Sequence, residues 1–164
     1  MKRPIASVLL LALSVPLLGG CDEDSVTGLT VKDLAGTWNV TSFAFTSVAN
    51  PALKQDLIDA GGSMTLVIQS DGSFSGTFNL PGVTPGALPI AGTVSLDEEA
   101  GTMHVRFSEA TLIYGLFTDF DAEFTLDEAR RILTWSFGPT PFDFPQNPEV
   151  GDEAAMVVVV LTRA

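Results

Sequence analysis

The chain contains one cysteine, Cys21, and one histidine, His104, so it offers few of the side chains that carry nucleophilic, acid–base or metal chemistry. A catalytic serine would need His104 as its base, and the sequence has no Gly-x-Ser-x-Gly motif. Zinc sites need several histidine or cysteine ligands. His104 alternates with apolar neighbours beside Arg106, which predicts a solvent-facing position on a strand. We therefore expect no catalytic residue, no metal site and no cofactor, and we do not expect an enzyme.

Cys21 follows a segment with the composition of an export signal. Lys2 and Arg3 supply positive charge, residues 5–18 are uncharged, and two glycines lead into the cysteine. The uncharged stretch is shorter than the roughly 20 residues of a membrane-spanning helix. We therefore expect residues 1–20 to be a signal peptide that is removed.

The four residues Leu18-Gly19-Gly20-Cys21 resemble the lipobox of bacterial lipoproteins. The resemblance implies that a diacylglyceryl group on Cys21 anchors the mature protein to a membrane of the cell envelope. The alternative is a secreted protein with a free thiol, since one cysteine cannot form an internal disulfide. Residues 21–30 are expected to form an acidic tether. Asp22 resembles the inner-membrane retention signal of enteric bacteria, whereas in other phyla an acidic stretch here resembles a surface-export signal. The inner membrane, the outer membrane with the periplasm, and the cell surface all stay open.

Charge limits the partners of the mature chain. Two of the eight basic residues and none of the twenty acidic residues lie in residues 1–20, so six oppose twenty in the mature chain, a net charge of −14. Such a charge repels nucleic acid, and no nucleic-acid partner is expected. Acidic residues gather at 97–99 and 152–153 with a spacing unlike an EF-hand loop, which favours solvated turns. The length suits one domain over residues 31–164, expected to be a monomer.

Apolar and polar residues alternate along most of the chain from residue 35 onward. Such alternation is typical of half-buried antiparallel strands, with one face toward the core. Asp71-Gly72 lies between two such runs and is typical of a tight hairpin turn. We expect eight strands, at approximately 36–47, 62–69, 73–80, 88–96, 102–108, 118–126, 131–137 and 154–163.

Two of the expected strands have patterns that indicate a closed barrel. The first carries Trp38 and Val40 on one parity but Phe43 and Phe45 on the other, which predicts a bulge near residues 41–42. The last strand is apolar on both faces, so it is safest with a paired neighbour on each side. A closed ring, in which the last strand meets the first, provides both neighbours.

One short helix is expected over residues 51–60, after the first strand, because Asn50 can cap it and Pro51 suits its first position. Three longer connections are expected to be loops, at 81–89, 108–117 and 138–151. The third contains four prolines, which argue against a strand there.

Gly36-Thr37-Trp38 opens the first expected strand and resembles the Gly-x-Trp motif of lipocalins and related calycins. The resemblance implies an eight-stranded up-and-down barrel, with Trp38 plugging one end and an arginine from the last strand packed across its ring. Arg163 stands where that arginine would be. Together with the lipobox, the mature chain resembles the bacterial lipocalin-like lipoproteins. We therefore expect an all-β fold, an eight-stranded antiparallel up-and-down β-barrel, with one short helix after the first strand.

The apolar faces of the expected strands carry no charge, so a ligand inside the barrel would be hydrophobic. A barrel of eight strands is just wide enough to be filled by side chains or to hold one small ligand. Two functions stay open: an anchored protein that binds a small hydrophobic molecule or lipid, and a structural or protein-interaction module with a filled barrel. Aromatic residues expected near the mouth are Tyr114, Phe117, Phe142 and Phe144. The candidate ligand-contacting residues are Phe74, Phe78, Met103, Phe107, Phe120 and Phe124.

Overall fold

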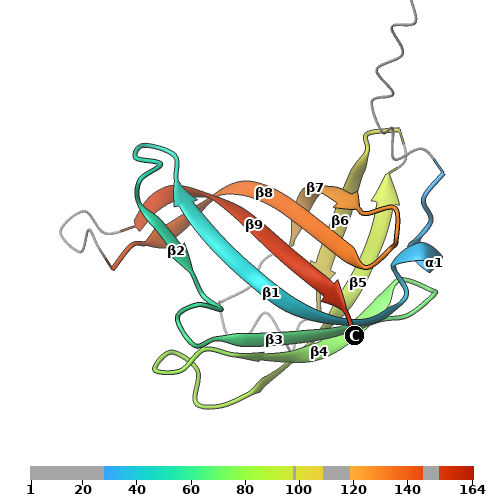
Figure 1. The fold of residues 1–164 in the computed structure, drawn as a ribbon, viewed down its shortest axis with the longest axis horizontal. Coiled ribbons are helices and arrows are strands. Elements are labelled where there is room, and N and C mark those ends of the chain that lie inside the picture. Colours follow the sequence, from blue (N-terminus) through green and yellow to red (C-terminus); the bar gives the residue numbers. More distant parts are fainter. Residues whose placement is uncertain (1–27, 98, 109–118, 146–151) are drawn as a thin grey trace, which may run out of the picture.

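The computed structural model describes residues 28–97, 99–108, 119–145 and 152–164. Its elements are α1 (Val31–Leu34), β1 (Gly36–Ser47), β2 (Lys54–Asp56), β3 (Ser63–Ile68), β4 (Ser73–Asn79), β5 (Leu88–Asp97), β6 (Thr102–Phe107), β7 (Phe120–Leu126), β8 (Ile132–Asp143) and β9 (Asp152–Arg163). Eight of the strands form an antiparallel ring in the order β1-β3-β4-β5-β6-β7-β8-β9 (Figure 1). The pairing between β1 and β9 closes the ring. The expected all-β, eight-stranded antiparallel barrel is confirmed. Within the described residues, no helix has the length and apolar character to cross a membrane.

Strand β1 changes its inward face at the predicted bulge. The ladder between β1 and β9 shifts register between Val40 and Ser42. Trp38 and Val40 are buried before the shift, and Phe43 and Phe45 face the interior after it. The extra residue in β1 lets both pairs of apolar side chains point inward, because a one-residue insertion reverses the parity of a strand.

Strand β9 pairs with β1 on one side and with β8 on the other, as its two apolar faces predict. Ala155, Val157, Val159 and Leu161 point inward and are buried. With both neighbours present, the backbone of this strongly apolar strand offers no open edge to another chain.

The helix expected over residues 51–60 is wrong. Asn50 and Pro51 do begin a turn, in which the Leu53 N–H donates to the Asn50 carbonyl at 2.8 Å. The chain then forms β2, which pairs with residues 44–46 of β1. That edge of β1 is available because β3 pairs only with residues 36–39. Backbone pairing with an open strand edge therefore overrides the local helix signals. The one helix of the described residues is α1, which precedes β1.

The loop expected over residues 138–151 is also partly wrong, since β8 continues to Asp143. The ladder with β9 shifts register between Phe137 and Thr140, and Pro139 falls within this shift. The pairing of β8 with β7 extends no further than Ser136. Beyond that point β8 is an edge strand with one neighbour, where a missing proline N–H is tolerated.

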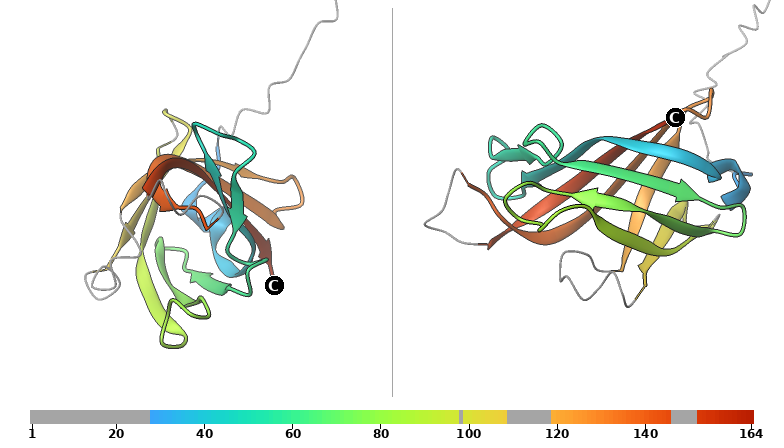
Figure 2. Two further views of the ribbon diagram at one scale, coloured as in Figure 1. Left: turned by 90° about the vertical axis from the view of Figure 1, so that its left-hand side faces the viewer. Right: turned by 90° about the horizontal axis from the view of Figure 1, so that it is seen from below.

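The barrel has two unlike ends. Short hairpins join the strands at one end, which also holds α1 and is called the plug end: residues 69–72, 98–101 and 127–131. The strands at the opposite end, called the mouth, are separated by longer stretches of sequence, of which the structure describes residues 48–62, 80–87, 108, 119, 144 and 145. Figure 2 shows α1 and the C-terminus together at one end of the elongated barrel.

Candidate functional site

Trp38 and Arg163 close the plug end. The Trp38 side chain is fully buried, and its Nε1 donates to the Leu34 carbonyl of α1 at 2.8 Å. The Arg163 guanidinium lies over the indole, 4.4 Å from the ring centroid. It also donates three hydrogen bonds of 2.7 to 2.9 Å to the backbone carbonyls of Asp33, Ala35 and Arg130. These contacts occupy both side chains within the protein, so their role is structural.

The glycine of the Gly-x-Trp motif makes room for this arrangement. Gly36 has φ of +148°, and a Cβ at this position would lie 2.7 Å from Nη1 of Arg163. A larger residue would therefore displace the guanidinium and strain the backbone. The sequence motif and the arginine contact are parts of one packing unit.

The barrel interior next to the plug is filled by side chains. Four of the six predicted ligand-contacting residues belong to the buried core of the barrel, namely Phe74, Phe78, Met103 and Phe124. The Phe74 ring lies so close to Gly92 that a Cβ there would be 2.7 Å from it. The other two predicted residues, Phe107 and Phe120, are partly buried, and Phe120 stacks on Phe137 with ring centroids 3.9 Å apart.

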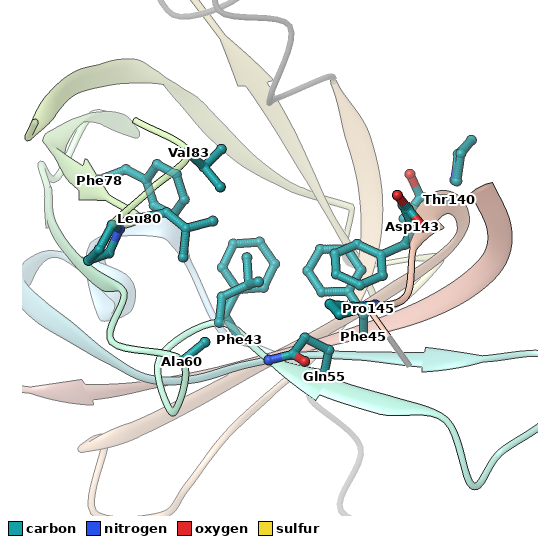
Figure 3. A pocket seen from close by; sticks show the side chains of 14 residues that line it. Phe43, Phe45, Gln55, Ala60, Phe78, Leu80, Val83, Thr140, Asp143 and Pro145 are labelled. Atoms are coloured by element: carbon teal, nitrogen blue, oxygen red, sulfur yellow. The ribbon is translucent and has the colours of Figure 1, made fainter. Parts of the chain in front are cut away.

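The mouth contains a pocket with a volume of about 790 Å³ (Figure 3). Most of its lining is apolar, and Phe78 is the one predicted ligand-contacting residue in it. Four segments supply the walls: the second half of β1, the β2 region, the end of β4 with the segment after it, and the end of β8 with the residues that follow. The lining residues are Phe43, Phe45, Gln55, Leu57, Ala60, Phe78, Leu80, Pro81, Val83, Thr140, Pro141, Phe142, Asp143 and Pro145.

Stacked phenylalanines form one wall of the pocket. The rings of Phe43 and Phe45 lie 5.3 Å apart and nearly parallel, and Phe142 stacks on Phe45 at 4.0 Å. Phe144 is fully buried and meets Phe142 edge-on at 4.9 Å. Phe142 and Phe144 were both expected near the mouth, whereas Tyr114 and Phe117 lie outside the described residues, as does Cys21.

Asp56 fixes the wall that β1 and β2 make. Its carboxylate accepts a hydrogen bond from Ser42 Oγ at 2.6 Å and others from the backbone N–H groups of Phe43 and Ile58 at 3.1 and 2.8 Å. Burial raises the pKa of Asp56, but these hydrogen bonds to the ionised form outweigh it and hold the pKa below its ordinary value. The ionised carboxylate thus ties the bulge of β1 to the turn after β2.

His104 lies on the outer face of the barrel in a row with two other polar residues. Ser95 of β5 and Asp121 of β7 are its direct neighbours in the ladders. His104 Nδ1 contacts the Asp121 carboxylate, and Nε2 accepts a hydrogen bond from Arg106 Nε at 2.9 Å. Nε2 is the atom that would take a proton from Ser95, and the arginine already occupies it. This row therefore lacks the serine–histidine contact of a nucleophilic site.

Sequence reasoning missed most of the pocket. The change of parity in β1 was the sequence signal that could have placed Phe43 and Phe45 in the pocket, because it predicts that both rings point inward after the bulge. Leu57 and Ala60 were not predicted to line a pocket because residues 51–60 were expected to form a helix. Pro141 was not predicted because residues 138–151 were expected to form a loop.

The chain matches no known family model, and no curated protein resembles it closely enough to count as a relative. The closed eight-stranded antiparallel barrel fits a lipocalin-like fold. The structure thus defines a β-barrel that is packed at one end and hollow at the other.

Proposed function

We propose that the protein is a membrane-anchored, lipocalin-like lipoprotein that binds a small hydrophobic molecule at the mouth of its barrel. The observation that carries this proposal is the apolar pocket of about 790 Å³ opposite the plug. Its volume lies within the range of small-molecule sites, which are mostly apolar with a few polar groups.

The walls of the pocket present apolar side chains to an open space. The stacked rings of Phe43, Phe45 and Phe142 stand against a hollow instead of a facing layer of side chains. Filling that hollow with a ligand would remove their apolar surface from water, a gain of about 25 cal/mol per Å². Val83 on the opposite wall is 60% exposed, which adds to the surface a ligand would cover.

The anchor is supported by the sequence alone. Cys21 follows the lipobox-like residues, and three acidic residues come directly after it. Two or more acyl chains would hold the protein stably to a membrane, because each buried methylene contributes about 0.8 kcal/mol. The proposed location is the cell envelope. Intact mass measurement of the membrane-extracted protein tests this: an acyl increment is expected in the wild type and none in Cys21→Ser.

Binding is tested with the mature protein in phosphatidylcholine nanodiscs, titrated with octanol in a calorimeter against empty discs. Saturable binding is expected, and Phe45→Ala should weaken it roughly tenfold because the variant removes a central ring of the wall. Val158→Ala is the control, since Val158 is an exposed apolar residue on the outside of β9.

A second function, a structural or protein-interaction module, is favoured by the packed half of the barrel. The side chains of Trp38 and Met103 are fully buried and belong to one packed hydrophobic core. Folded protein that shows no saturable uptake of octanol, in either the wild type or the control, would support this alternative and overturn the binding proposal.

A further inference from the structure

The mouth of the barrel is nearly devoid of positive charge. Among the described residues of the four mouth connections, Lys54 is the one basic residue, whereas the acidic residues are Asp56, Asp59 and Asp119. Lys54 is exposed and is not one of the residues that line the pocket. A bound carboxylate would therefore find no counter-ion among the described residues of the pocket wall.

Two carboxylates face each other at the pocket rim. Asp143 of β8 lines the pocket, and Asp152 of β9 is its direct partner in the ladder. Residues directly opposite each other in an antiparallel pair place their side chains on the same face, and two like charges there repel. Within the described residues, neither carboxylate has a hydrogen-bond or ion-pair partner that would offset this repulsion.

The wall beside this pair is aromatic. Phe142 precedes Asp143 in the chain and continues the stack of Phe43 and Phe45. The faces of aromatic rings carry partial negative charge and attract cations. The rim and the wall therefore both favour a positive group, while the rest of the lining favours an apolar body.

We propose that the mouth pocket takes hydrophobic cations, meaning an amine or quaternary ammonium group on an apolar body, and discriminates against carboxylates such as fatty acids. This inference rests on the proposed function, because it specifies the class of molecule that the same pocket binds. The ammonium group lies at the rim by Asp143 and Asp152, and the apolar body extends over the phenylalanine stack.

The test uses three ligands with one chain length: octyltrimethylammonium, octanol and octanoate. Each is titrated into the mature protein in phosphatidylcholine nanodiscs, with empty discs as the blank. The cation should bind most tightly, the alcohol less tightly, and the carboxylate roughly tenfold more weakly than the cation. Added salt should narrow the difference between the two charged ligands and leave the alcohol unchanged.

The double variant Asp143→Asn, Asp152→Asn removes both charges with little change in shape. It should bring the affinity for the cation down toward that for octanol, without weakening octanol. Glu128→Gln is the matched control, because it removes one exposed carboxylate at the plug end and should change none of the three affinities. A thermal melt of each variant checks that it is folded.

Octanoate binding as tightly as octyltrimethylammonium would overturn the inference and leave the proposed function intact. An unchanged preference for the cation in the double variant would also overturn it, since the rim carboxylates would then have no role. Failure of all three ligands to bind folded protein would overturn the proposed function and this inference together.

Discussion

The two ends of the barrel are built on opposite plans. At the plug end, Trp38 is fully buried, Arg163 covers it, and short hairpins leave little backbone outside the sheet. At the mouth, the connections are longer, and several apolar side chains line a hollow instead of packing against one another. The same eight strands thus end in a sealed core on one side and an open pocket on the other.

This difference assigns stability of the fold to the plug end of the barrel and ligand binding to the mouth. Buried side chains at the plug end contribute most to the free energy of unfolding, because their removal leaves a cavity that cannot fill with water. The side chains that line the pocket already border a hollow, so their loss costs less apolar burial. Substitutions at the two ends should therefore have different readouts.

The largest effect is expected from Trp38→Ala. The variant loses the buried indole, its hydrogen bond to Leu34 and the surface over which Arg163 packs. The free energy of unfolding should fall by about 3–5 kcal/mol in urea denaturation followed by circular dichroism. Phe43→Ala at the mouth is the comparison and should cost clearly less. Equal losses from the two variants would remove the distinction between the ends.

A smaller, pH-dependent effect is expected from Asp56→Asn at the mouth. Folding lowers the pKa of Asp56 below its ordinary value of 3.8, so the ionised form stabilises the fold. That contribution is fully present above pH 3.8 and is lost as the pH falls through the folded-state pKa. The difference in unfolding free energy between wild type and variant should therefore be about 1 kcal/mol at pH 7 and shrink in acid.

Asp59→Asn is the control for this measurement. Asp59 is exposed, and its carboxylate accepts no hydrogen bond among the described residues. A constant difference between wild type and Asp56→Asn from pH 7 to pH 2 would show that the carboxylate acts through shape and not through charge.

The smallest effect on stability is expected from Val83→Ser on the pocket wall. Val83 is 60% exposed, so the unfolding free energy should change by less than about 0.5 kcal/mol. Octanol binding should weaken in the same variant, since Val83 lines the pocket. A clear loss of stability without loss of binding would reverse the roles assigned to the two ends.

Alternation predicted the barrel well because most strands have one face in the core and one in water. The predicted range 36–47 coincides with β1, and the bulge followed from the parity of its aromatic residues. Trp38 and Arg163 could be paired from sequence because the resemblance to lipocalins supplied the contact between two residues that lie far apart in the chain.

The pocket was harder to predict because it depends on where strand edges are left open. Residues 54–56 became a strand only because β3 leaves β1 after Asn39, an event that no local pattern encodes. Pro141 could become part of β8 only because the pairing of β7 with β8 ends at Ser136. Both events are tertiary, and both bring their segments to the pocket wall.

The position of the first described residues also limits how the barrel can stand on a membrane. Gly28 and α1 lie at the plug end, so an anchor at Cys21 would pull on that end. The seven Cα-to-Cα steps from Cys21 to Gly28 reach at most about 24 Å, whereas a strand of the length of β1 rises about 30 Å along a tilted barrel axis. An acylated barrel could stand upright or lie flat, but it could not invert to press its opening into its own bilayer. Cargo would then enter from the aqueous side or from a facing membrane.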